Sequence, residues 1–443
     1  MNKRLILVVM ALVLGVALLA AACGSGTSTA TTAATTQTTA AGPATTAATT
    51  GTTAAGSTDT TAAGPATTAA GPATGEPIKL GYDEGFTNFM SYDTAQGDMG
   101  IKTALAMLNN QWMGRPLQYL YEDSTSDPVV AVDKARKLVE SDHINAMIGP
   151  IYSPAAKAVT DYLGKSSGIP MISINGQPTD NLATANGLAF LQMGLFDSQG
   201  YYFGKYLAEK GYKTANVINY DDTPAHALTD GFKKAFVDEG GGKVLSENYL
   251  DISTVDFSSY LSAMKPADVT FDWIFGNGAV PFVKQYHDYG LTAPLAVPMS
   301  NNYTDPQLAE LGDIALGMIA CDYYAYTLTG PGNADFVAAF EKLFPDQGGP
   351  NSEVYGAYQA VMLYLEALKA DGGDTTPSKV IPALAALKLD TPAGHVEFQS
   401  FKNAYIPKRD WYMLEAQKVN GVITWVPVKT YSQVVLGDLS TTP

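Results

Sequence analysis

From Ile78 onward, short apolar runs alternate with longer segments in which apolar residues recur at helical spacing. In one such segment, residues 129–141, Val132, Ala135 and Leu138 fall on one face of a helix. Strands are expected at 78–81, 117–121, 146–148, 171–174, 215–220, 244–249, 273–276 and 295–298. Strands that alternate with helices predict an α/β fold, in which a parallel sheet carries helices on both faces.

The same rhythm restarts after Met193, which predicts a second α/β domain of similar size. Residues 352–370 place apolar side chains at helical spacing, a pattern that indicates a packing face. Asn420-Gly421 separates the apolar runs 411–416 and 422–428, and this spacing predicts a β-hairpin with a tight turn.

The stretch from Ala146 to Ala156 predicts a strand that runs directly into a helix. A glycine-proline pair ends the strand, and Ser153 followed by Pro154 is typical of a helix N-cap with proline at the first helical position. Unpaired N–H groups and the helix dipole make such a junction a site for a carboxylate or another anion. The alternative is that Ser153 only caps its own helix. The loop at Asn175 follows the next strand and is expected at the same sheet edge.

The chain begins with the features of an export signal. Lys3 and Arg4 precede a continuously apolar stretch, which predicts a signal peptide over residues 1–22. An uncleaved membrane anchor is the alternative, because the stretch is nearly long enough to span a bilayer. Three alanines before Cys23 resemble the lipobox of bacterial lipoproteins, in which that cysteine receives a lipid. The protein is therefore expected at the outer face of the cytoplasmic membrane, with the lipid as its only membrane contact.

The composition of residues 23–77 predicts a lipidated cysteine followed by a disordered tether. They consist almost entirely of Thr, Ala, Gly, Pro and Ser. Such a segment has no large apolar side chains to bury, so it cannot offset the entropy lost on ordering. Its repeated Ala-Ala-Gly-Pro-Ala-Thr units indicate a low-complexity spacer rather than a folded repeat.

Charge and the scarcity of reactive side chains argue against several function classes. The formal net charge is −16 and no patch of Lys and Arg with interleaved aromatics occurs, so nucleic acid is not expected as a partner. The four histidines are scattered without metal-ligand spacing, and Cys321 lies in an apolar run. No phosphate loop or nucleophile motif is complete. We therefore expect a non-enzymatic protein with no catalytic residues, no metal site and no cofactor.

Several motifs occur in the order typical of one protein family. They are Tyr121–Val132, Met147–Gly149, Gly168–Ser173, Leu195–Gly200, Asp256–Ser258 and Gly312–Gly317. This ordered set resembles the type I periplasmic binding proteins, and within them the branched-chain amino-acid and aromatic-acid binding branch of ABC importers. The resemblance covers about Ile78 to Val428.

The resemblance implies two Rossmann-like lobes, each with a parallel central sheet, joined by three crossovers near Asp197, Asp322 and Asp410. The expected boundaries are 78–196 with 323–409 for lobe 1, 197–322 with 410–430 for lobe 2, and 431–443 for a C-terminal tail. A small ligand would bind between the lobes as they close.

The resemblance also implies which residues hold the ligand. Ser153, Asn175 and Gln177 of lobe 1 are expected to bind a ligand carboxylate. Asn277 and Asn301 are expected to reach the ligand from lobe 2. The lobe 2 positions that match the ammonium-binding residues of amino-acid-binding relatives lack the tyrosine and the acid. A buried ammonium without an acid is costly, so organic acids, aromatic acids or amides are favoured over α-amino acids.

Aromatic residues are expected to wall the pocket. Tyr92 is taken as a ligand contact, together with Phe89, Tyr152 and Tyr324 as candidate walls; the alternative for each is ordinary packing. The pair Asp221-Asp222 is expected in a solvated loop.

These features together predict an extracytoplasmic solute-binding protein of an ABC importer. It would capture a small carboxylate-bearing ligand, such as an amino acid, an aromatic acid or an organic acid, and deliver it to a permease in the cytoplasmic membrane. The alternative is a ligand sensor, in which the same two lobes report occupancy to a membrane receptor or kinase.

Overall fold

The computed structural model describes residues 74–435, 437 and 439 of the 443-residue chain. The predicted signal peptide (1–22), Cys23 with its predicted lipid, and the predicted tether up to residue 73 lie outside the described residues. Among the described residues, no helix combines the length and the apolar character needed to cross a bilayer.

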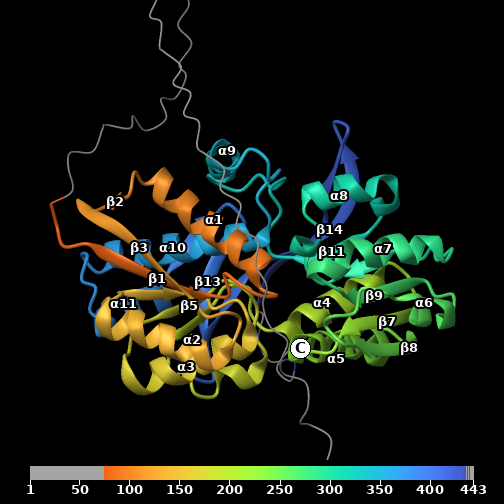
Figure 1. Cartoon of the computed structure of the whole chain (residues 1–443), viewed down its shortest axis with the longest axis horizontal. Helices are drawn as coiled ribbons and strands as arrows, with labels where there is room; N and C mark the ends of the chain where they lie inside the picture. Colours follow the sequence, from red (N-terminus) through yellow and green to blue (C-terminus); the bar gives the residue numbers. More distant parts are fainter. Residues whose placement is uncertain (1–73, 436, 438, 440–443) are drawn as a thin grey trace, which may run out of the picture. The chain divides into compact units, whose positions relative to one another are not determined.

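The first half of the described chain forms a parallel sheet in the order β3-β1-β4-β5-β6, and β2 pairs antiparallel with β3 at its edge. The strands are β1 (Ile78–Glu84), β2 (Gln111–Trp112), β3 (Arg115–Asp123), β4 (Ala146–Ile148), β5 (Met171–Ser173) and β6 (Ala189–Leu191). The helices on this sheet are α1 (Ser91–Met107), α2 (Pro128–Arg136) with its extension η1 (Lys137–Ser141), α3 (Ser153–Ser166), η2 (Thr179–Leu182), α10 (Ser352–Ala370) and α11 (Pro377–Ala385). Helices α1 and α10 lie over one face of the sheet, and α2 and α3 lie over the other (Figure 1).

The second half repeats this arrangement with the parallel order β11-β10-β9-β7-β8. Its strands are β7 (Thr214–Tyr220), β8 (Lys243–Leu250), β9 (Val269–Trp273), β10 (Leu295–Val297) and β11 (Ile319–Asp322). Its helices are α4 (Phe196–Glu209), α5 (Thr223–Lys233) with η3 (Lys234–Glu239), α6 (Ser258–Ala263), η4 (Gly276–Gly278), α7 (Ala279–Asp288), η5 (Ser300–Asn302), α8 (Asp305–Leu311) and η6 (Gly312–Ala315). The predicted α/β fold is confirmed.

One predicted strand of this half is wrong. The sequence pattern places a strand at 273–276, whereas β9 ends at Trp273. The buried strand contains the polar residues Thr270 and Asp272, which interrupt its apolar pattern, so the apolar residues just beyond its end were mistaken for the strand itself. β9 begins four residues and ends three residues earlier than predicted, so Trp273 lies at its end rather than at its start.

A long strand links the two halves. β14 (Ala404–Val419) pairs parallel with β6 through Ala404 and Tyr405, and antiparallel with β11 through the segment 412–415. β13 (Gly394–Phe401) and β15 (Val422–Val435) flank it, and β12 (Lys388–Thr391) pairs with β13. The predicted hairpin therefore extends well beyond 428, and residues 431–435 of the predicted tail belong to β15. The lobe boundaries themselves remain a prediction.

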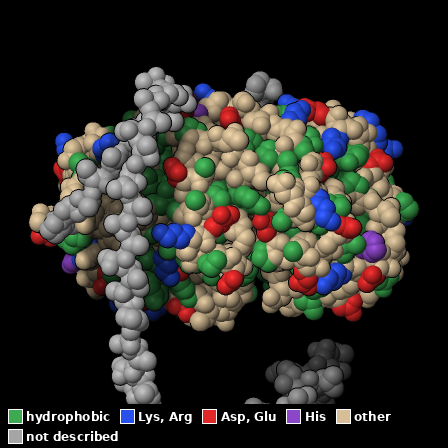
Figure 2. Space-filling model, turned by 90° about the horizontal axis from the view of Figure 1, so that it is seen from above, with side chains coloured by type: hydrophobic (Ala, Val, Ile, Leu, Met, Phe, Trp, Pro, Cys, Tyr) green, Lys and Arg blue, Asp and Glu red, His purple; other side chains and the backbone are tan. Residues whose placement is uncertain are grey.

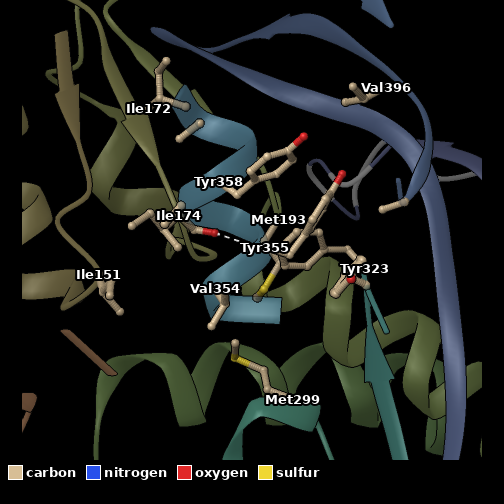
Figure 3. Close-up of a cluster of buried hydrophobic side chains, with 14 of the residues drawn as sticks. Ile151, Ile172, Ile174, Met193, Met299, Tyr323, Val354, Tyr355, Tyr358 and Val396 are labelled. Carbon is tan, nitrogen blue, oxygen red and sulfur yellow. Dashed lines mark hydrogen bonds between the residues drawn. The ribbon is translucent and has the colours of Figure 1, made fainter. Parts of the chain in front are cut away.

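Alternating side chains of the strands supply separate cores on the two faces of each sheet. In β7, Val217 packs into one buried cluster and the next residue, Ile218, packs into another. In β4, Ile148 and Met147 divide in the same way. Helix α10 contributes to the core on one face, where Val354 and Tyr358 are buried among residues of several strands (Figure 3).

Helices α4 and α5 pack with their backbones in close approach. A Cβ atom added at Gly231 would lie 1.9 Å from the carbonyl oxygen of Asp197, and one added at Gly200 would lie 2.0 Å from that of Leu228. Both glycines are therefore required by the packing of this helix pair.

Replacing Gly231 with alanine is expected to lower the free energy of unfolding by about 1–3 kcal/mol, because the added methyl group forces the two helices apart. Urea unfolding followed by circular dichroism would measure this. The exposed neighbour Asp230, replaced by alanine, is the control, with an expected change within about 0.5 kcal/mol. Equal stability of the two variants would contradict the close-packing argument.

Candidate functional site

A cavity of about 480 Å³ lies at the carboxyl ends of the parallel strands from both halves. The segments that follow β1, β4, β5, β6, β7, β8, β9 and β10 all contribute to its lining. The lining residues are Phe89, Met90, Asp93, Ile151, Tyr152, Ser153, Asn175, Phe196, Asp221, Asp222, Pro224, Asp251, Ile252, Trp273, Phe275, Met299, Asn301 and Asn302. Its volume suits a small organic ligand.

Ser153 occupies this cavity at the N-terminus of α3, but it is not the N-cap. The N-cap is Tyr152, with the extended backbone angles φ −65° and ψ 114°, and Ser153 is the first residue of the helix. The predicted capping role is therefore wrong. A capping side chain belongs to the residue that precedes the first helical residue, and Ser153 is already inside the helix. Ser153 is buried and lines the cavity. The hydroxyl and the helix N-terminus are both available to an anionic ligand group.

The loop after β5 places its two predicted ligand residues differently. Asn175 lines the cavity, and its Oδ1 accepts a hydrogen bond from the backbone N–H of Gly176 at 2.7 Å, which leaves Nδ2 to serve as a donor. Gln177 does not line the cavity. Its Oε1 accepts from Asn181 Nδ2 at 2.8 Å, and that Nδ2 also donates to the Ser153 carbonyl oxygen at 2.9 Å. Gln177 thus stabilises the backbone of Ser153 indirectly, through Asn181.

Two further predicted residues lie outside the lining. The Tyr92 hydroxyl donates to Thr304 Oγ1 at 3.3 Å, a contact that joins α1 to the N-cap of α8 in the other half. Asn277 is exposed in η4. Of the candidate aromatic walls, Phe89 and Tyr152 line the cavity, whereas Tyr324 is buried elsewhere and donates to Asn333. The structure therefore brings Ser153, Asn175 and Asn301 together, and it separates Tyr92, Gln177 and Asn277 from the cavity.

Asn301 presents an unsatisfied acceptor. Its Nδ2 donates to Glu353 Oε2 in the first turn of α10 at 3.1 Å, while its Oδ1 is buried and has no partner within the described chain. The neighbouring Asn302 Nδ2 is also buried and unpartnered among the described residues. Because buried polar groups are almost always hydrogen-bonded, these two atoms have unused capacity for one donor and one acceptor.

The apolar walls of the cavity are aromatic or belong to the core. The ring centroids of Phe89 and Tyr152 lie 5.1 Å apart, edge to face, and those of Trp273 and Phe275 lie 5.3 Å apart. At the base, Ile151 and Met299 belong to the buried cluster that surrounds the N-terminal turns of α10 (Figure 3). Such walls suit a ligand with an aromatic or aliphatic body.

Four aspartates face the cavity: Asp93 from the first half, and Asp221, Asp222 and Asp251 from the second. The expectation that no acid faces the ligand from lobe 2 is therefore wrong. The acids directly follow the ends of β7 and β8, at positions other than those inferred from the resemblance. No Lys, Arg or His is among the residues that line the cavity.

Asp222 is the most constrained of these acids. It is the N-cap of α5, and its Oδ1 accepts from the Ala225 N–H at 2.8 Å, while Trp273 Nε1 donates to its Oδ2 at 3.3 Å. Burial nevertheless raises the pKa of Asp222 to about 6, and burial likewise raises the pKa of Asp93 to about 6. Asp221 is exposed and pairs with His226 at 2.8 Å. The predicted solvated loop therefore describes Asp221 but not Asp222.

Sequence reasoning missed Phe196, Trp273, Phe275, Asp222 and Met299. Each of them lies just after the carboxyl end of a parallel strand or closes that strand, so correct strand ends would have identified them. The misplaced end of β9 in particular hid Trp273.

Comparison with known proteins identifies the family. Residues 77–420 match the family model described as periplasmic binding protein. The chain belongs to this family. Its members are solute-binding proteins that act outside the cytoplasm, so the predicted family, the extracytoplasmic binding role and the absence of an enzymatic function are confirmed.

Individual proteins show the same likeness. The leucine-, isoleucine-, valine-, threonine- and alanine-binding protein of Pseudomonas aeruginosa is 27% identical over 71% of this chain and 86% of its own. A solute-binding protein of an ABC transporter from Rhodopseudomonas palustris, solved with p-hydroxybenzoic acid, superposes with a TM-score of 0.74 at 24% identity over 81% of this chain and 97% of its own. A branched-chain amino-acid binding protein from Streptococcus pneumoniae, solved with isoleucine, has a TM-score of 0.68 at 19% identity over 79% and 99%. These structures share the fold.

Proposed function

We propose that the protein captures a small carboxylate-bearing metabolite between its two halves and delivers it to the permease of an ABC importer. The observation that carries this proposal is that Ser153, a buried residue at the N-terminus of α3, lines a cavity to which both halves contribute. The ABC transporter relatives that bind aromatic acids and amino acids support this role over sensing.

In this proposal, binding and closure are coupled. Ser153 and Asn175 hold the ligand from the first half, and Asn301 with Trp273 contacts it from the second half. A ligand that contacts both halves shifts the population toward the closed form by its differential affinity for that form. No bond is made or broken, and export with lipid attachment at Cys23 would keep the protein near the membrane.

Surface charge supports a small-molecule partner. Lys and Arg side chains are intermingled with Asp and Glu on the face shown in Figure 2, where no broad basic area is visible. Together with a net charge of −16, this distribution disfavours nucleic acid as a ligand.

A thermal-shift screen of the purified protein against amino acids, aromatic acids, organic acids and amides tests the proposal. A bound ligand stabilises the native state by RT ln(1 + [L]/Kd), so a micromolar ligand at millimolar concentration should raise the melting temperature clearly. If no carboxylate in the panel changes the melting temperature, the proposed function is wrong.

Replacing Ser153 with alanine is expected to weaken binding of the ligand found in that screen by roughly 10- to 100-fold, because a charged acceptor loses a buried donor. Isothermal titration calorimetry measures the change. Ser166, at the exposed C-terminal end of the same helix, provides the matched control, and Ser166→Ala should bind normally. An unchanged dissociation constant in the Ser153→Ala variant would remove Ser153 from the site.

A further inference from the structure

The cavity combines acidic groups on both sides with no basic group in its lining. Asp93 faces it from α1, and Asp222 faces it from the start of α5. The Asp222 carboxylate lies near enough to Tyr152 of the first half to raise the pKa of that phenol, although burial is the larger cause. The two acids therefore belong to opposite walls of one binding space.

The surroundings of both acids supply little positive charge. Beside Asp93 lie the phenol of Tyr92 and the carboxyl groups of Glu84 and Glu353; burial raises the pKa of both carboxyl groups well above the usual range, which favours their neutral forms. Around Asp222 lie Asp221, His226 and Tyr152, of which only His226 can bring positive charge. His226 already pairs with Asp221. A monoanionic ligand would enter this field without a cation from the protein to balance it.

An independent observation points to the same ligand chemistry. The Asn301 Oδ1 is a buried acceptor with no partner among the described residues, and Nδ2 of the same amide is committed to Glu353. The cavity therefore offers this acceptor to a ligand N–H group. The rings of Trp273, Phe275 and Tyr152 line the same space and can stabilise a cation through their faces.

We infer that the ligand carries net positive charge, with cationic nitrogens that bind between Asp93, Asp222 and the Asn301 carbonyl oxygen. The inference rests on the proposed function and narrows its ligand class to carboxylates that bear at least two amine- or guanidinium-type groups. The ligand carboxylate keeps its place at Ser153, and the nitrogens supply the positive charge that the cavity lining lacks.

Matched probes test this charge preference. L-arginine and L-citrulline have nearly the same shape but differ by one positive charge, and benzoate and L-leucine represent an anion and a neutral amino acid. Calorimetry should give L-arginine a dissociation constant lower than that of L-citrulline by roughly 10-fold or more. Tighter or equal binding of L-citrulline, L-leucine or benzoate overturns the inference and leaves the proposed function standing. Failure of every probe to bind overturns the inference, and the thermal-shift screen then decides on the proposed function.

Two variants assign the preference to the acids. In Asp222→Asn or in Asp93→Asn, whichever acid holds the side-chain cation, the ratio of L-citrulline to L-arginine dissociation constants should fall by roughly 10-fold, while L-citrulline binding reports that the fold is intact. Asp230→Asn, on the exposed face of α5, should keep the wild-type ratio. An unchanged ratio in both cavity variants overturns the inference.

The affinity for a cationic ligand should depend on pH. A cation bound beside Asp93 and Asp222 favours their charged forms, so binding releases protons. Because the pKa of each carboxyl group is about 6 without ligand, L-arginine affinity should rise as the pH rises from 5 to 7. A fall in affinity over this range would show that the ligand prefers protonated acids and would overturn the inference.

Discussion

Replacing Asp322 with alanine is expected to lower the free energy of unfolding by about 3–5 kcal/mol, the largest stability loss that we predict. Asp322 closes β11 and is fully buried. Its Oδ2 accepts from the Ser300 N–H at 3.0 Å, from Ser300 Oγ at 2.7 Å and from Ser352 Oγ at 2.8 Å. It thereby joins η5, which lines the cavity, to the start of α10. Alanine leaves all these donors buried without an acceptor.

Urea unfolding would measure this loss, and two further variants serve as controls. Asp322→Asn keeps the shape and one acceptor oxygen, so its loss should be smaller. Asp313→Ala removes an exposed carboxylate that lies 3.4 Å from the Lys418 ammonium nitrogen, and it should change stability by less than about 1 kcal/mol. If Asp322→Ala unfolds at the same urea concentration as the wild type, these hydrogen bonds do not stabilise the junction.

Replacing Trp273 with alanine is expected to weaken ligand binding by about 2–4 kcal/mol, which corresponds to roughly 30- to 1,000-fold in the dissociation constant. Its indole lines the cavity between Phe196 and Phe275, with centroid distances of 6.1 Å and 5.3 Å. It also holds Asp222 through Nε1. Alanine therefore removes both an aromatic wall and the donor that orients an acid of the site.

Calorimetry with the ligand identified in the screen measures this effect. Trp112→Ala is the matched control, because Trp112 lies in β2 and donates to the Leu365 carbonyl oxygen at 3.0 Å, outside the cavity lining. It should lower stability and leave the dissociation constant unchanged. Trp273→Phe keeps a ring without the N–H donor and should lie between the wild type and alanine. Normal binding by Trp273→Ala would mean that the ligand does not occupy this part of the cavity.

Local patterns in the sequence were sufficient for the fold class and for many elements. β4 and α10 begin and end at the predicted residues, because a short apolar run with a glycine-proline stop, and apolar side chains at helical spacing, depend only on neighbouring residues. The ordered motifs also led to the correct family. Ser153 and Asn175 were expected at the cavity because each follows the carboxyl end of a strand, an edge that the alternation of strands and helices already defines. Asn301, which also lines the cavity, was implied by the family resemblance.

Only the tertiary structure decided which side chains face the ligand. The cavity brings together segments from Phe89 to Asn302. Residues of the same loop differ in their roles: Asn175 lines the cavity, whereas Gln177 lies outside it and stabilises Ser153 through Asn181. Asp222 faces the cavity because α5 begins there and Trp273 holds it, a contact across 51 residues of sequence. The backbone angles at Tyr152, rather than the Ser-Pro pair, assigned the cap of α3. Such long-range contacts and backbone angles leave no periodic signal in the sequence, so the acidic character of the site emerged only from the folded chain.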